Sequence, residues 1–142
     1  MADNALRLIV RLRQLTLDQA RESLGGSLRA EEAADLAVQR AEAALDRERS
    51  VAALQAGRHA ADWCANWVSV GRKIREDAVT AQARASGHTR RTRTGLAAAR
   101  AAREAAEDLL SARESARKAV WERREQLALE EAARNREEEN DE

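Results

Sequence analysis

Apolar residues recur every seven positions along the first third of the chain. The series that begins at Val10 is apolar at six of its seven positions: Val10, Leu17, Leu24, Glu31, Val38, Leu45 and Ala52. A second, interleaved series holds mostly small residues: Leu6, Arg13, Ala20, Ser27, Ala34, Ala41 and Glu48. Two series offset by three and four residues lie on one side of an α-helix and form the contact face of a coiled coil. The pattern predicts one helix over residues 4–55.

The composition excludes most other fold classes. More than half of the 142 residues are Ala, Leu, Arg, Glu or Lys, and the sequence has no Pro, Phe or Tyr and only six Gly. These are the proportions of a long helix or coiled coil rather than of a sandwich, barrel or doubly wound sheet. Because 25 basic residues balance 25 acidic ones, the unbalanced charge typical of disordered chains is absent. The predicted fold class is all-α.

A turn is predicted over residues 56–61. Gly57 suits a left-handed helix end, and Asp62 suits the N-cap of a new helix. Two stretches of apolar residues at helical spacing follow: Trp63, Trp67, Val70, Ile74 and Ala81, and then Ala99, Ala102, Ala106, Leu109, Ala116, Val120 and Leu127. The second helix is therefore predicted over residues 62–134. Residues 1–136 would form a single long antiparallel two-helix coiled-coil hairpin, and residues 137–142 a frayed acidic tail.

Residues 87–95 offer an alternative position for the turn. This stretch, from Gly87 to Gly95, has low helix propensity at nearly every position. If it formed the turn, residues 62–86 would pair with residues 96–135. The turn near Gly57 is favoured because the tryptophan-rich stripe after it needs the first helix as a partner. Gly25 and Gly26 are expected to cause a bend at most.

The sequence carries little material for catalysis or metal binding. It has a single cysteine, Cys64, two histidines, and no glycine-rich phosphate loop or ligand pair at metal-site spacing. No apolar run approaches the 18 or so residues of a membrane span. We therefore expect no catalytic residues, no cofactor, no metal and no membrane-spanning helix.

Some large apolar residues fall outside the predicted contact face. Leu8, Leu12 and Leu15 lie about 150° from Leu6, Val10 and Leu17 at 100° per residue, so they form a nearly opposite face. Trp121 lies on a flank of the second helix, and tryptophan is enriched in protein interfaces. In a hairpin, both regions belong to the end that holds the two termini. Trp63 and Trp67, in contrast, are expected to pack near the turn.

One segment is strongly basic. No acidic residue occurs between Asp77 and Glu104, whereas six arginines do: Arg84, Arg90, Arg91, Arg93, Arg100 and Arg103. Such a run is either an ordinary solvated face or a surface that binds phosphates or an acidic protein. It contains no aromatic residue for base stacking, so it favours a protein partner over nucleic acid.

The whole pattern resembles the FliJ/YscO family of type III secretion stalk proteins. The residues that carry the resemblance are the leucine-rich start (Leu8, Leu12, Leu15, Leu17, then Ala20–Arg21), the tryptophan-bearing entry to the second helix (Asp62–Trp63 through Ile74), and the segment Ala119–Leu127 followed by Glu130–Ala133. The resemblance covers nearly the whole chain.

The resemblance implies a function and a location. Members of this family are cytoplasmic helical hairpins, peripheral to the inner-membrane secretion apparatus, whose paired termini enter the hexameric secretion ATPase. Leu8, Leu12, Leu15 and Trp121 would then face the ATPase. Trp63 and Trp67, or the run containing Arg90, Arg91 and Arg93, would meet the export gate or a chaperone. The protein would be a monomeric, non-enzymatic hairpin that serves protein transport.

Two other functions remain open from the sequence. A nucleic-acid-binding helical arm would use residues 84–103, and its binding would fall steeply with salt. A generic scaffolding coiled coil would form parallel homodimers, in which the two Cys64 residues would lie close together if they are near the contact face.

Overall fold

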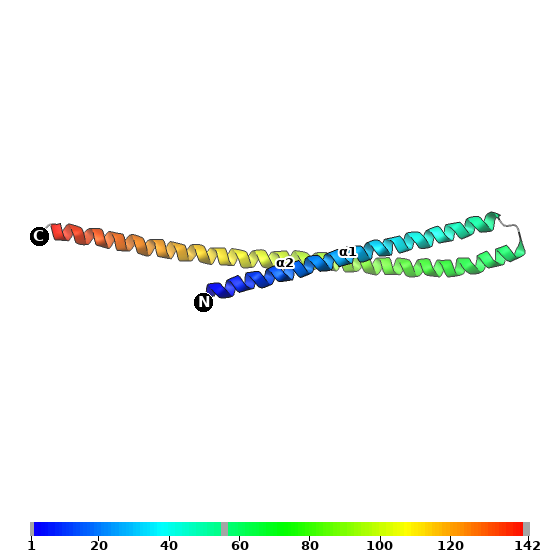
Figure 1. The fold of residues 1–142 in the computed structure, drawn as a ribbon, viewed down its shortest axis with the longest axis horizontal. Helices are drawn as coiled ribbons and strands as arrows, with labels where there is room; N and C mark the ends of the chain where they lie inside the picture. Colours follow the sequence, from blue (N-terminus) through cyan, green and yellow to red (C-terminus); the bar gives the residue numbers. More distant parts are fainter. Residues whose placement is uncertain (1, 55–56, 141–142) are drawn as a thin grey trace. The chain divides into compact units, whose positions relative to one another are not determined.

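The computed structural model describes residues 2–54 and 57–140 and is all-α throughout these ranges. Helix α1 spans Ala2–Leu54 and helix α2 spans Arg58–Asn140. The two helices pack against each other as a long antiparallel hairpin (Figure 1). Residues 87–95, the alternative turn, are helical, so the chain reverses between Leu54 and Arg58. Gln55 and Ala56, which end the predicted first helix and begin the predicted turn, lie outside the described residues.

Gly57 has a different role from the predicted one. No glycine in the described ranges has a positive φ, so Gly57 is not a left-handed helix end. Its carbonyl oxygen instead accepts a hydrogen bond from the backbone N–H of Ala61 at 3.2 Å, which makes Gly57 the N-cap of α2. Helix α2 therefore begins at Arg58, four residues before Asp62.

The far end of α2 also differs from the predicted bound. The acidic segment expected to fray from residue 137 is helical as far as Asn140, while residues 141 and 142 lie outside the described residues. No Gly or Pro follows Gly95, and glutamate is a good helix former, so nothing in this segment terminates the helix.

The hairpin divides into two compact units. Unit 1 contains the described residues up to Thr16 together with those from Arg100 onward, and unit 2 contains Leu17–Ala99. Each helix runs unbroken through the position at which the units divide. Gly25 and Gly26 lie within α1 without ending it, because each glycine costs a helix only about 1 kcal/mol relative to alanine.

The inward face of α1 is the one that its sequence predicts. Leu6 is buried in unit 1, and the buried residues of unit 2 on α1 are Leu17, Ser27, Val38, Ala41 and Leu45. All six belong to the two interleaved series of seven-residue spacing. The heptad pattern thus identified the face of α1 that packs on α2, with Arg13 the one exposed member among its fourteen positions.

The inward face of α2 is the predicted one at Ala99, Ala102 and Ala106, and differs from the prediction at the larger residues. Trp63, Val70, Ile74 and Leu109, all assigned to the contact face, are more than half exposed. The residues that do face α1 recur every seven positions and are mostly small, buried or half-buried: Cys64, Gly71, Ala78, Ala85, Thr92, Ala99 and Ala106. The physical reason is space, because the bulky leucines of α1 fit only against small residues when the helices approach closely.

Gly71 shows how close this approach is. A Cβ atom placed on Gly71 would lie 2.7 Å from Cδ2 of Leu45 and 2.9 Å from Cζ3 of Trp67. Leu45 is 4% exposed, so its side chain fills the space that a larger residue at position 71 would need. The glycine is therefore required by packing.

A layer of hydroxyl groups replaces apolar contacts in unit 2. Thr89, 1% exposed, places its hydroxyl 3.3 Å from the carbonyl oxygen of Ser27 and 3.1 Å from that of Ala85, and shares its hydrogen between them. The Thr92 hydroxyl lies 3.2 Å from the Ser27 hydroxyl, which itself donates to the carbonyl of Ser23 at 2.8 Å. These hydrogen bonds connect residues 87–95, a segment of low helix propensity, to α1. Contacts between the two helices therefore stabilise the helical conformation of this segment.

Polar pairs beside the contact face define the antiparallel register within each unit. In unit 1, Asp3 pairs with Arg117 and with Arg113, and Arg7 lies 3.1 Å from Glu114. In unit 2 the pairs are Asp35 with Gln82 at 2.8 Å and Glu42 with Arg75 at 3.0 Å. Most of these pairs are exposed and contribute little stability each, but they show which residues lie opposite one another.

Candidate interaction surfaces

The leucine face of α1 is exposed in unit 1. Leu8, Leu12 and Leu15 are each more than half exposed, whereas Leu6 is buried and Val10 half-buried. The spacing of four and three residues places the three leucines on one side of the helix, away from α2. The sequence prediction of this face is confirmed. An apolar stripe left in water on a folded hairpin is typical of a site that binds another protein.

Trp121 is the most exposed tryptophan, at 62%. It lies in unit 1 and lines a shallow cleft of about 290 Å³ with Glu114, Arg117 and Lys118. Because Asp3 pairs with Arg117, Trp121 lies one turn beyond this pair on α2, and Leu8 lies more than one turn beyond it in the opposite direction on α1. At 1.5 Å rise per residue the two are roughly 13 Å apart along the axis, so they do not form one continuous patch.

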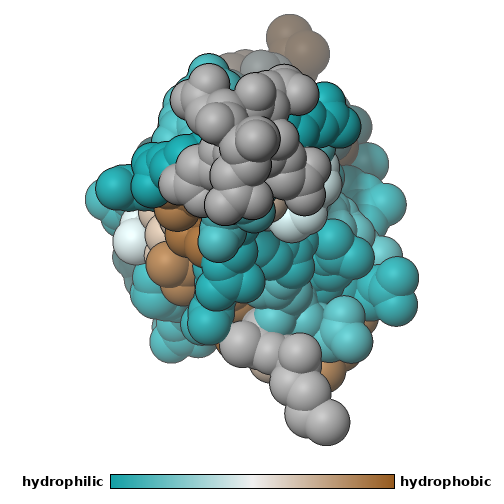
Figure 2. Space-filling model, turned by 90° about the vertical axis from the view of Figure 1, so that its left-hand side faces the viewer, coloured by the Kyte–Doolittle hydropathy of each residue, from teal (hydrophilic) through white to brown (hydrophobic). Residues whose placement is uncertain are grey.

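Figure 2 views the molecule from the end at which α2 finishes. Most of this surface is hydrophilic, and hydrophobic residues appear on it as small separate patches. Small separate hydrophobic areas of this kind are normal on a protein surface.

A second apolar face lies on α2 in unit 2. Trp63, Val70 and Ile74 are each more than half exposed at spacings of seven and four residues. Trp67 is half-buried, with its ring against Gly71, as its predicted packing near the turn requires. Trp63 differs from the same prediction, since it faces away from α1. Of these four residues, Trp67 therefore packs between the helices and the other three are exposed.

The arginines of the basic run do not gather on one face. Arg90, Arg91 and Arg93 are all exposed, and among the described residues none of them forms an ion pair. At 100° per residue, Arg91 and Arg93 point about 160° apart around α2. Arg103, in unit 1, pairs instead with Glu107 at 2.7 Å.

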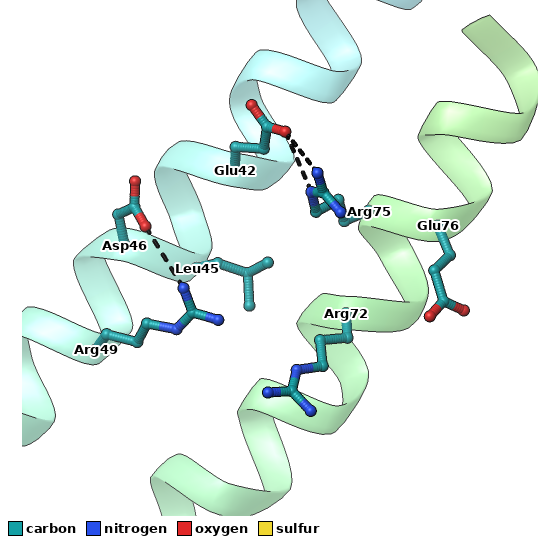
Figure 3. A pocket seen from close by; sticks show the side chains of 7 residues that line it. All are labelled: Glu42, Leu45, Asp46, Arg49, Arg72, Arg75 and Glu76. Carbon is teal, nitrogen blue, oxygen red and sulfur yellow. Dashed lines mark hydrogen bonds and ion pairs between the residues drawn. The ribbon is translucent and has the colours of Figure 1, made fainter. Parts of the chain in front are cut away.

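A cleft between the helices of unit 2 is lined by charged side chains that compensate one another (Figure 3). It encloses about 420 Å³ and is lined by Glu42, Leu45, Asp46, Arg49, Arg72, Arg75 and Glu76. Arg75 donates from Nε and Nη2 to the same carboxylate oxygen of Glu42, at 3.1 and 3.0 Å. Asp46 pairs with Arg49 at 3.8 Å. Three carboxylates and three guanidinium groups leave no net charge to attract an anion or a cation.

Metal-binding groups do not cluster within the described ranges. No set of three or more His, Cys, Asp or Glu residues there is placed to hold a metal ion. Cys64 is a half-buried free thiol on the inward side of α2. In residues 2–54 and 57–140, no helix is apolar over a length sufficient to cross a membrane.

The comparisons with known proteins give no relative. No family model matches the chain, and no match was found among characterised proteins or solved structures.

Proposed function

We propose that the chain is a non-enzymatic coiled-coil stalk or accessory protein of a type III secretion export apparatus, of the FliJ/YscO kind. The observation that carries this proposal is the exposed leucine face of Leu8, Leu12 and Leu15 in unit 1. This unit holds both the start of α1 and the C-terminal part of α2, so it is the end of the hairpin that the resemblance directs into the secretion ATPase. The site of action would be the cytoplasmic side of the apparatus.

The partner assignments follow the exposed surfaces. The leucine face, with Trp121 as a separate contact, would bind the hexameric ATPase. The face of Trp63, Val70 and Ile74, or the exposed Arg90, Arg91 and Arg93, would bind the export gate or a chaperone. A large exposed aromatic residue is the kind of side chain on which binding energy concentrates.

Stimulation of a purified type III secretion ATPase tests the proposal. We expect the native chain to raise ATP turnover or promote hexamer assembly, and Leu12→Asp to weaken this effect by roughly 30-fold in the concentration required. Leu36→Asp is the matched control, since Leu36 is an exposed leucine of α1 in unit 2 and its substitution adds the same charge. No stimulation by a fully helical native chain, or equal loss in both variants, would count against the proposal.

One observation favours a second candidate function. The exposed, unpaired Arg90 and Arg91 of unit 2 are available to phosphate groups, as a nucleic-acid-binding arm would require. Binding of a duplex that falls steeply with salt, and that Arg90→Glu with Arg91→Glu removes, would support this candidate. The parallel scaffold is less favoured, because the contact face it would use on α1 is already covered by α2.

A further inference from the structure

Helix α2 continues well beyond the beginning of α1. Helix α1 begins at Ala2, and Asp3 already pairs with Arg113 and Arg117. The segment 118–140, here called the overhang, therefore has no α1 residues opposite it (Figure 1). All side chains from Ser115 to Glu137 are exposed. At 1.5 Å per residue the overhang is roughly 34 Å long, and a single helix of this length is marginal in water without a packing partner.

The overhang carries exposed apolar residues on one side of α2. Leu109, Val120 and Leu127 are each more than half exposed, and at 100° per residue Val120 and Leu127 point within about 20° of Leu109. Leu110 and Glu114 are half-buried, so the side that packs on α1 is a different one. The apolar stripe of Val120 and Leu127 is therefore not used by the hairpin and is available to another helix.

Charge along the overhang is divided between its two halves. Residues 118–124 carry three basic groups and one acidic group, whereas residues 125–137 carry four acidic and two basic groups. The sequence after residue 137 adds four more acidic groups. A helix with one basic and one acidic half is complementary to a copy of itself in the antiparallel direction, and repels a copy in the parallel direction.

We infer that the overhang is the docking site for a second copy of this chain, whose own overhang packs against it antiparallel. Leu127 of each copy lies near the two-fold axis and Val120 further from it, and the basic half that contains Arg123 and Arg124 faces the partner's acidic half. The contact is a two-fold symmetric one, with the same surface used by both copies. It needs no other protein, so it goes beyond the proposed role at the ATPase.

A second copy bound to the overhang would also affect binding of the ATPase. Trp121 lies at the edge of the Val120 face, about 60° around the helix from Arg124, so a second copy would cover it. Leu8, Leu12 and Leu15 lie on α1 outside the overhang. Self-association and ATPase binding would therefore compete for Trp121 but not for the leucine face.

Leu127 and Leu129 provide a matched pair of variants. Both are exposed leucines of the overhang, at 55% and 66%, but they point about 160° apart around α2. We expect sedimentation equilibrium of the full chain to show a reversible dimer, which Leu127→Asp weakens roughly tenfold or more and Leu129→Asp leaves intact. Circular dichroism of each variant establishes that its helicity is unchanged. A native chain that stays monomeric at high protein concentration, or equal dissociation in both variants, overturns the inference.

The direction of pairing has its own test. In a Cys64→Ser background, a spin label on Ala119→Cys would lie roughly 20 Å along the axis from its copy in an antiparallel dimer centred near Gln126. In a parallel dimer the two labels would be side by side. Pulsed electron spin resonance distinguishes the two distances. A short distance would overturn the antiparallel contact and support a parallel scaffold instead.

Exchanging charges tests the recognition itself. Arg123→Glu combined with Arg124→Glu places acidic groups opposite the partner's acidic half, so we expect the dimer to dissociate. Adding Glu130→Arg and Glu131→Arg to the same chain restores the complementarity, and we expect the dimer to return. Failure of this fourfold variant to dimerise, with helicity retained, would show that charge does not direct the contact.

Discussion

At the scale of single residues, the glycines differ in how closely other side chains approach them. A Cβ atom on Gly71 would lie 2.7 Å from Leu45, whereas one on Gly25 or Gly26 would meet nothing within 4 Å. Gly71→Ala should destabilise the hairpin by about 1–3 kcal/mol, because buried Leu45 and the rigid Trp67 ring cannot both move aside. Gly25→Ala should stabilise it by about 0.5–1 kcal/mol through helix propensity. Urea unfolding followed by circular dichroism measures both, and a stabilising Gly71→Ala would contradict the close helix approach.

Lys73 is a residue whose titration the structure predicts. Its Nζ donates a hydrogen bond to Oδ1 of Asp77 at 2.9 Å, and this bond and the Asp77 charge raise the pKa of Lys73 above its ordinary value of 10.5. The stabilisation from this pair is therefore complete below pH 10.5 and is lost as the pH rises through the raised pKa. Asp77→Asn should lower the pKa of Lys73.

Carbon-13 NMR of the lysine side chains measures this change. The sequence has only two lysines, Lys73 and Lys118, so Lys118→Arg assigns the signals. Glu76→Gln is the control, because the charge of Glu76 is the smallest of the effects that raise the pKa of Lys73, and its removal should lower the value less. If the pKa of Lys73 is the same in the native chain and in Asp77→Asn, the two side chains do not form this pair in solution.

At the scale of the helix, the packing face of α1 could be predicted from its sequence and that of α2 only in part. On α1 the large apolar residues and the inward face coincide, so the seven-residue spacing is sufficient to find Leu17, Val38 and Leu45. On α2 the inward face is formed by small residues, of which Ala99 was predicted and Gly71 was not, while large residues such as Ile74 lie outward. Hydrophobicity alone selects the wrong side in such a case. Small residues repeated every seven positions were the signal that could have found it.

Whether the phase of a helix is predicted correctly also decides which candidate surfaces can be predicted. Leu8, Leu12 and Leu15 followed from the phase of α1, which was correct. The exposure of Trp63, Val70 and Ile74 did not follow, because the phase of α2 was assigned from those residues themselves. The overhang depends on the relative lengths of α1 and α2, and these follow from the position of the turn and of the last helical residue rather than from any motif.

A pair of variants tests the corrected face of α2. Leu45→Ala should cost about 2–5 kcal/mol of unfolding free energy, because it leaves a cavity opposite Gly71. Ile74→Ala should change it by less than about 0.5 kcal/mol, since Ile74 is 54% exposed and faces away from α1. Denaturant unfolding of both variants makes the comparison. A large cost for Ile74→Ala would restore the originally predicted contact face.

At the scale of the whole molecule, protection from solvent is distributed unevenly between the two units and the overhang. Unit 2 contains most of the buried side chains, including Leu17, Leu45 and Thr89. In unit 1, Leu6 is the one buried residue of α1, and the facing part of α2 is mostly half-buried. The overhang has no buried side chain among its described residues up to Glu137. Local opening free energies follow buried apolar contacts, so the three regions should open independently and with different ease.

Hydrogen exchange measured by mass spectrometry resolves these regions. In dilute solution, where self-association is weakest, amides of the overhang should exchange fastest, those of the paired part of unit 1 more slowly, and those of unit 2 slowest. Leu45→Ala is the control, because it should accelerate exchange in unit 2 and leave the overhang unchanged. At high protein concentration the overhang should gain protection, since a second copy would then cover Val120 and Leu127. Uniform protection along α2 in dilute solution would mean that the overhang is stabilised by contacts other than those of this hairpin.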